Sequence, residues 1–141
     1  MREILFRAKP SRNKKWVYGS LIYVKREHNS FCCILESEDS GRYDYPYLDA
    51  DLGIIDGEAI PVDFTTIGQY TGMNDKNGNK IFEGDILKGK YGLHRVLFDT
   101  SLAEFEWARI DGNWTESFSG FADEYEIIGN VYDNPELLKG E

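Results

Sequence analysis

The sequence predicts a small protein built mostly of β-strands. Short runs rich in β-branched and aromatic residues alternate with turn residues, a layout typical of all-β folds. Glycine occurs 14 times among the 141 residues, and helical patterns are scarce. The dipeptide Asn77-Gly78 is the strongest hairpin signal, because a type I′ turn needs positive φ at both of its central positions.

The first half is expected to form a β region. Candidate strands cover residues 4–6, 16–24 and 31–35, and a basic loop at 9–15 joins the first two. Gly19 interrupts the second strand, where glycine indicates a bulge or a close backbone contact. Residues 36–62 are expected to form an acidic connection followed by irregular or extended chain.

The second half is expected to contain several short strands in about seventy residues, which favours a small barrel or roll. The expected strands are 67–71, 81–82, 85–90, 94–98, 104–110, 114–117 and 125–132. Asn134 suits a helix N-cap and Pro135 a first helical position, so a short C-terminal helix is expected at 134–138. We predict a β region at 1–62 and a barrel with this helix at 63–141, packed as one compact unit.

The charge is distributed unevenly along the chain. Residues 1–26 hold eight basic side chains and one acidic one, a net charge of +7. The remaining residues hold 8 basic and 24 acidic side chains, a net charge of −16, and the total is −9. Such asymmetry predicts that one part of the protein meets an oppositely charged surface.

The basic N-terminal segment is the candidate partner-binding site. Its members are Arg7, Lys9, Arg12, Lys14, Lys15 and the aromatic Trp16. They could dock on the acidic surface of the protein itself or of a second copy, bind a single nucleic-acid strand through phosphates and stacking, or form a plain solvated loop. The net negative charge disfavours nucleic acid, although salt screening beyond about 8 Å would let a local patch act.

No cofactor or metal is expected. Cys32 and Cys33 are adjacent, so on a strand they would point to opposite faces, and they lack the spacing of a zinc site. The N-terminus carries charges where a signal peptide needs an apolar segment, and no run approaches membrane-span length. We therefore expect a cytoplasmic protein.

The other polar patterns favour structural roles over catalysis. Residues 68–72 lack the Gly-Lys-Ser/Thr of a phosphate loop, and residues 75–79 lack the later ligands of a calcium loop. The remaining candidates are an acidic cluster, two histidines and a carboxylate pair, namely Asp49, Asp51, Asp56, Glu58, His28, His94, Glu83 and Asp85. None completes a nucleophilic or metal motif, and Glu83 and Asp85 are expected to cap a turn. No catalytic residue is assigned.

Three segments resemble a known family. These are TIGQYTGMNDKNGNKIFEGDIL at 66–87, EIIGNVYDNPELL at 126–138, and FRAK followed by KKWVYGSL near the N-terminus. They are similar to the signatures of the YopX-like phage and prophage proteins. The resemblance implies a phage or prophage origin and a β-rich fold with an SH3-like barrel in the second half. It implies no reaction.

These observations favour a non-enzymatic protein-interaction or assembly module that forms a homo-oligomer or binds a host or phage protein. The alternative is a nucleic-acid-binding accessory protein that uses the basic N-terminal loop. A hydrolase with paired carboxylates is the third and least favoured reading.

Overall fold

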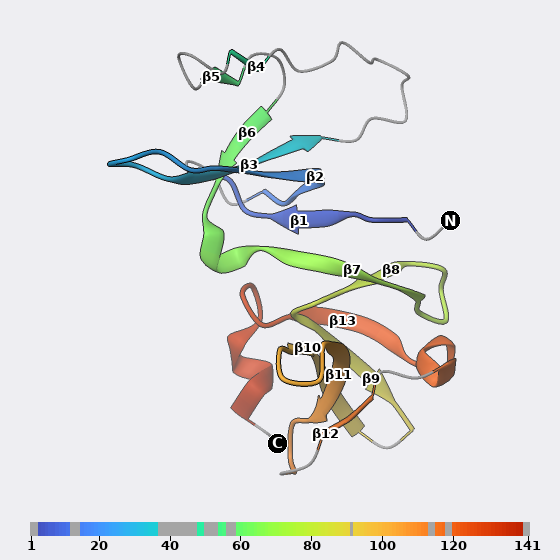
Figure 1. Cartoon of the computed structure of the whole chain (residues 1–141). Helices are drawn as coiled ribbons and strands as arrows, with labels where there is room; N and C mark the ends of the chain where they lie inside the picture. The colour runs from blue at the N-terminus through green and yellow to red at the C-terminus, as the bar shows by residue number, and fades with distance from the viewer. Residues whose placement is uncertain are drawn as a thin grey trace. The chain divides into compact units, whose positions relative to one another are not determined.

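Strands dominate the part of the chain that the structure describes, which confirms the prediction of a mostly-β protein (Figure 1). The structure, a computed structural model, describes residues 3–11, 15–36, 48–49, 54–55, 59–90, 92–112, 115–117 and 120–139. Within these residues every helical segment is a 3₁₀ turn and none is an α-helix. The chain divides into two units, Ile4–Gln69 and Met1–Glu3 together with Tyr70–Glu141.

The first unit contains a curled antiparallel sheet. Its strands are β1 (Phe6–Ala8), β2 (Val17–Val24), β3 (Phe31–Glu36), the small pair β4 (Leu48–Asp49) and β5 (Ile54–Ile55), β6 (Ala59–Val62), and the start of β7 (Gly68–Asn74). The main sheet has six strands in the order β6-β3-β2-β1-β7-β8, where β8 is Lys80–Phe82, and β4 and β5 pair separately. The first strand therefore lies two residues later than expected, and the expected irregular stretch before residue 62 ends in a strand.

The segment after β1 closes this sheet into a roll. Pro10 bridges Val62, the Ser11 N–H donates to the Pro61 carbonyl (3.3 Å), and the Asp63 N–H donates to the Lys9 carbonyl (2.9 Å). The chain that leaves one end of the ladder β6-β3-β2-β1 thus pairs with the strand at the other end. The core inside consists of Ala8, Val17, Ile34 and Val62 with surrounding half-buried apolar side chains.

Gly19 and the two cysteines lie within this ladder. A Cβ at Gly19 would overlap the carbonyl of Leu35, so the close backbone contact expected there is confirmed. Cys32 and Cys33 follow each other on β3 and are both free, Cys32 half-buried and Cys33 buried. Burial and the neighbouring Cys32 thiol raise the pKa of Cys33, so its sulfur stays protonated.

The second unit contains a five-stranded antiparallel sheet in the order β12-β11-β10-β9-β13. Its elements are the rest of β7, β8 (Lys80–Phe82), β9 (Asp85–Gly89), β10 (Gly92–Asp99), β11 (Glu104–Arg109), β12 (Thr115–Ser117), η2 (Gly120–Glu124), β13 (Glu126–Asn130) and η3 (Pro135–Lys139). The three expected hairpins β7–β8, β9–β10 and β11–β12 are all present. The core consists of Ile81, Leu87, Val96, Trp107, Ala122 and Tyr125.

The turn between β7 and β8 differs from the expected type I′ hairpin. Only Gly78 has positive φ (82°), and Asn77 does not. The Gly78 N–H donates to the Asp75 carbonyl (3.0 Å), and the Asp75 N–H donates to the Asn79 carbonyl (2.8 Å). A hydrogen-bonded turn followed by one left-handed glycine makes a longer loop with a bulge, the other common hairpin solution.

The Asp75 carboxylate explains this turn. Oδ1 accepts hydrogen bonds from the N–H groups of Asn77 and Asn79, both at 2.9 Å, and Oδ2 accepts one from Ile127 in β13 (3.0 Å). Beside it, the Lys76 N–H donates to the Tyr125 carbonyl (2.9 Å). One buried side chain thus shapes the hairpin and ties it to a strand fifty residues later.

A second junction forms where β8 passes into β9. Buried Asp85 accepts a hydrogen bond from the Phe82 N–H through Oδ2 (2.7 Å), so the turn-capping role expected for this carboxylate is confirmed. The Gly84 N–H donates to the Val96 carbonyl (2.8 Å), and the Gly84 carbonyl accepts from Val131 (2.9 Å). The segment Glu83-Gly84-Asp85 therefore joins β8 to β9 and hydrogen-bonds through Gly84 to β10 and to the residue that follows β13.

The C-terminal helix is present as a 3₁₀ turn, η3. Asn134 Oδ1 accepts from the Asn130 N–H (3.2 Å), and the Asn134 carbonyl accepts from Leu137 (3.1 Å). A Cβ at Gly129 would lie 2.5 Å from this Oδ1, so the Asn134 side chain occupies the space that the glycine leaves. The amide expected to cap a helix instead holds the turn against the end of β13.

The Asp75 carboxylate yields a prediction about stability. Asp75→Ala leaves three backbone donors without their charged acceptor, and we expect the free energy of unfolding to fall by about 3 kcal/mol. Asp111→Ala is the control, because Asp111 is exposed and its ion pair with Arg109 should contribute less than about 1 kcal/mol. Denaturant titration measures both, and equal losses would contradict the anchoring role.

The same carboxylate predicts the direction of the pH dependence. Burial opposes ionisation of Asp75, but the hydrogen bonds from Ile127, Asn79 and Asn77 outweigh it and lower the pKa of the carboxyl below 3.8. A lowered pKa stabilises the fold above the unfolded-state pKa, and this contribution is lost as pH falls through the folded-state pKa. The wild type and Asp75→Ala should therefore converge in stability at the acid end of the titration.

The contact between Gly129 and Asn134 predicts a non-additive pair. Gly129→Ala should destabilise the protein, because its Cβ meets the amide of Asn134. Adding Asn134→Ala removes the two nearest atoms of that contact, and the double variant should recover about 1 kcal/mol relative to the sum of the single losses. Strictly additive losses in a thermal or denaturant cycle would show that the contact is not the cause.

A candidate partner-binding face

The basic N-terminal residues converge with two aromatic side chains on one face of the β1–β2 ladder. Arg7 is paired with Tyr18 in the register, while the flanking pair Ala8 and Val17 points into the core. Because side chains alternate along a strand, Arg7 and Tyr18 point away from that core, and Lys9 and Trp16 continue the same side. We call Arg7, Lys9, Trp16 and Tyr18 the basic–aromatic face.

Cation–π contacts organise this face. The guanidinium carbon of Arg7 lies 4.6 Å from the centre of the Trp16 ring, and Nζ of Lys9 lies 5.3 Å from it. Both distances fall within the roughly 6 Å at which such contacts stabilise, by about 0.5–2 kcal/mol each. Arg7 is only 5% exposed, whereas Tyr18 is 41% exposed. Arg7 therefore supports the face from below, and the accessible groups are the rings and Lys9.

The backbone of Lys9 is held on both sides. Its N–H donates to Oγ1 of Thr66 (2.9 Å), and its carbonyl accepts from Asp63. Thr66 belongs to the turn η1 (Phe64–Thr66) that follows β6. Lys9 is the first cation beyond β1, and its backbone is already ordered in the fold. Binding a partner would therefore cost little backbone entropy at this residue.

The same turn carries an aromatic residue that the sequence analysis missed. Phe64 is 73% exposed, the most exposed large apolar side chain in the described part of the chain. Asp63 caps the turn, its Oδ1 accepting from the N–H (3.0 Å) and Oγ1 (2.7 Å) of Thr65, and these bonds lower the pKa of the Asp63 carboxyl. The pattern Asp-Phe-Thr-Thr could have indicated the turn, because an Asp side chain commonly accepts a hydrogen bond from the backbone two residues later. Phe64 is the first residue of that short turn, and its side chain is exposed.

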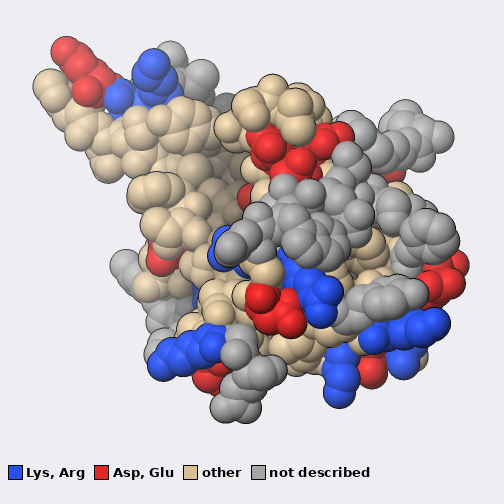
Figure 2. All heavy atoms as spheres, turned by 90° about the horizontal axis from the view of Figure 1, so that it is seen from below, with Lys and Arg blue, Asp and Glu red and all other residues tan. Residues whose placement is uncertain are grey.

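The predicted site is described in part. Lys15 is exposed next to Trp16, whereas Arg12 and Lys14 lie outside the described residues. On the face drawn in Figure 2, acidic and basic side chains lie intermingled and do not separate into two fields. An electrostatic contact on this drawn face would therefore be local.

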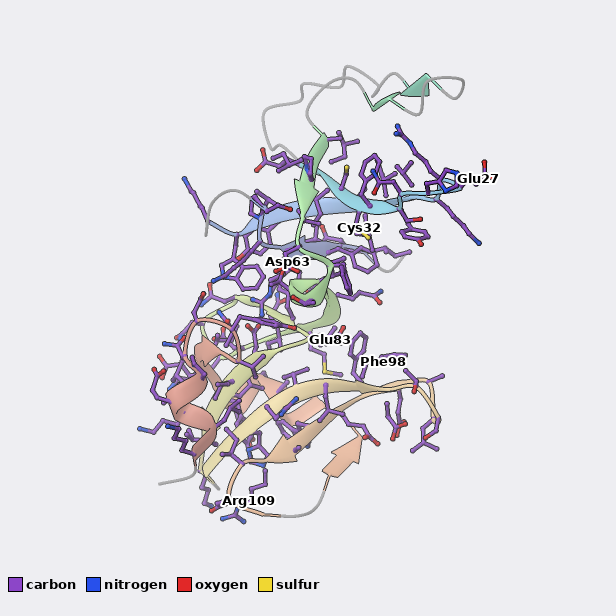
Figure 3. The ribbon with its side chains drawn as sticks, turned by 90° about the vertical axis from the view of Figure 1, so that its left-hand side faces the viewer. Glu27, Cys32, Asp63, Glu83, Phe98 and Arg109 are labelled. Atoms are coloured by element: carbon purple, nitrogen blue, oxygen red, sulfur yellow. The ribbon has the colours of Figure 1, made fainter. Side chains whose placement is uncertain are left out.

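The other candidates occupy structural positions. His28 lies at the exposed end of the β2–β3 hairpin, 3.9 Å from the carboxylate of Glu27, which Figure 3 labels at the same hairpin end. His94 is buried against the rings of Trp107 (5.0 Å between centroids) and Tyr125 (5.4 Å). One histidine is thus solvated, and the other is part of an aromatic core.

The acidic cluster falls largely outside the described residues. Asp51, Asp56 and Glu58 are not described, and Asp49 is described only as a member of β4. In the described ranges, no three histidine, cysteine, aspartate or glutamate side chains stand close enough together to hold a metal ion. None of the helical segments described is long and apolar enough to cross a membrane.

The comparisons with known proteins agree with the sequence resemblance. A comparison with curated proteins gave no match. Among solved structures, the crystal structure of protein EF1440 from Enterococcus faecalis is 28% identical and covers 98% of this chain and 99% of its own, with a TM-score of 0.56. The sequence model of the YopX protein family matches residues 5–139. The chain therefore belongs to the YopX family.

Proposed function

We propose that this protein is a non-enzymatic interaction module of phage or prophage origin that binds an acidic protein surface and forms homo-oligomers. The observation that carries the proposal is the basic–aromatic face, where Trp16 and Tyr18 lie beside Lys9 on a rigid ladder. Tryptophan, tyrosine and arginine are the residues that most often dominate binding energy in protein interfaces.

Three of the buried polar groups in the described residues support a non-enzymatic role. Asp75, Asp85 and Asn130 are all buried, and each accepts backbone hydrogen bonds that shape a turn. Groups saturated in this way are poorly placed to transfer protons or to attack a substrate. Their chemistry supports a scaffold, and we assign the function to the outer surface.

We also propose that the second unit is an SH3-like roll. Its five antiparallel strands and the short η2 turn suit that architecture. SH3-like rolls host both protein and nucleic-acid ligands, so the fold by itself does not choose between them. The charge favours a protein ligand. A net charge of −9 repels the phosphates of a nucleic acid, whereas an acidic protein surface can be bound through a local contact.

The proposal predicts salt-sensitive self-association. The mass measured by light scattering should exceed 16.2 kDa at low salt and should fall toward it as added salt shortens the screening length to about 3 Å at 1 M. Reversing the charges of Lys9, Arg12, Lys14 and Lys15 should abolish the larger species. A wild type that stays monomeric at low salt and high concentration would refute self-association.

The nucleic-acid alternative is tested with the same variant. A gel shift with single- and double-stranded DNA and RNA at low salt should show no complex under the proposed function. A shift that the four reversals abolish would reassign the basic–aromatic face to nucleic acid. A shift that they leave intact would place nucleic-acid binding elsewhere on the chain.

A further inference from the structure

The tip of the β10–β11 hairpin is an exposed surface of opposite character to the basic–aromatic face. Residues 98–106 contain three acidic side chains and no basic one. The register pairs Phe98 with Phe105 and Asp99 with Glu104 at the end of the ladder. In Figure 3, Phe98 and Arg109 lie at opposite ends of this ladder, which places Phe98 toward the tip.

The turn at this tip is rigid. Oδ1 of Asp99 accepts hydrogen bonds from the N–H (2.8 Å) and Oγ (2.6 Å) of Ser101 and from the N–H of Leu102 (3.2 Å). The bonds from Ser101 and Leu102 lower the pKa of the Asp99 carboxyl, so it is ionised at neutral pH. Ala103 has a φ of 54°, a left-handed conformation that the surrounding turn has to support.

This rigid turn presents apolar side chains to solvent. Leu102 is 62% exposed and Phe98 is 39% exposed. The Phe98 ring meets Phe105 edge to face, with 5.1 Å between centroids. A small apolar cluster on a preformed turn loses little conformational freedom on binding, which favours its use as an interface anchor.

One side of the tip collects negative charge. Strand alternation places Asp99, Glu104 and Glu106 on the same face of the ladder. Glu106 is buried, and burial together with the charges of Asp99 and Glu104 raises the pKa of its carboxyl. A cation brought to this face would relieve that repulsion, so the tip gains from a basic partner.

We propose that this hairpin tip, from a second copy of the chain, is the acidic surface that docks on the basic–aromatic face. The inference rests on the proposed function and names its partner. Lys9 and Lys15 face the carboxylates of Asp99 and Glu104, while Leu102 packs against the aromatic rings. The second unit has a net charge of −7 from 8 basic and 15 acidic residues, and the first unit −2 from 8 and 10, so the second unit carries most of the net negative charge.

The contact joins two different surfaces, so the interface is isologous in a two-fold dimer and heterologous in a ring. Two copies can exchange tips reciprocally, or several can close into a ring. Either arrangement lets every copy use both surfaces, so a defect in either surface should weaken assembly. That symmetry makes a complementation experiment decisive.

The test uses two charge-reversed variants of the full chain. The first, Lys9→Glu with Lys15→Glu, inverts the basic–aromatic face. The second, Thr100→Lys with Glu104→Lys, inverts the tip and keeps Asp99, which holds the turn. By sedimentation velocity at low salt, each variant alone should self-associate at least about tenfold more weakly than the wild type.

Mixing the two variants should restore assembly, because each inverted surface then meets an inverted partner. Matched controls with the same charge changes at exposed sites outside both surfaces are Lys25→Glu with Lys139→Glu, and Asn29→Lys with Glu136→Lys. Each control variant, measured by itself, should assemble as the wild type does. Mixing the two control variants should not change their assembly. Circular dichroism of all four variants checks that each one is folded.

Three results would overturn the inference. If only the face variant loses assembly, the basic–aromatic face binds an acidic surface other than this tip, and the proposed function stands alone. If neither variant loses assembly, both the inference and the proposed use of the face are wrong. If both variants lose assembly and the mixture stays at 16.2 kDa, the tip and the face act separately and do not meet each other.

Discussion

The second unit depends on the buried carboxylate of Asp75. It is 4% exposed, and it is the common acceptor for two backbone donors of its own turn and for one in β13. A buried charge is tolerated only when its hydrogen bonds replace the lost water. In Asp75, Oδ1 accepts hydrogen bonds from its own turn, and Oδ2 accepts one from Ile127, which is distant in the sequence. The hairpin and the closing strand β13 are therefore coupled in the folded protein, because both are needed to satisfy the group.

The same principle accounts for the residues that define the family signatures. Asp85, Gly129 and Asn130 lie in these signatures, and each has a role in shaping the backbone. Asp85 caps the Phe82 N–H, Gly129 makes room for the Asn134 side chain, and Asn130 accepts from the N–H groups of Tyr132 and Asp133. Two stretches of sequence that lie about forty residues apart thus specify one junction. A family can keep such a signature for folding alone, and the partner can differ outside it.

Sequence patterns predicted the elements well wherever punctuation by glycine, asparagine and proline marks a hairpin. They failed where a hydrogen bond from a side chain to the backbone, or a long-range backbone pairing, decides the outcome. The turn at Asn77-Gly78 is longer than type I′ because Asp75 organises it, and Asn134 does not cap as expected because its amide serves Asn130. The roll closed by Pro10 and Val62 was invisible because the pairing spans fifty residues. At the candidate site, composition identified the cations and Trp16, but only the side-chain geometry of the folded chain shows that Arg7 stacks on the Trp16 ring.

The burial of Arg7 also determines how strongly the basic–aromatic face can bind. Only 5% of Arg7 is exposed, so its guanidinium is poorly accessible to a partner's carboxylate, although a two-pronged ion pair is the strongest contact an arginine offers. The available cations are lysines, whose hydrated point charges speed and orient encounters more than they hold complexes. Most of the binding energy then has to come from apolar area on Trp16, Tyr18 and the residue packed against them. A single contact of this kind, with charged residues only at its rim, is weak. Assembly is then expected only if each chain takes part in two such contacts, one through its face and one through its tip. Under the proposed function, reciprocal exchange or ring closure satisfies that condition, so a modest local complementarity would suffice for assembly.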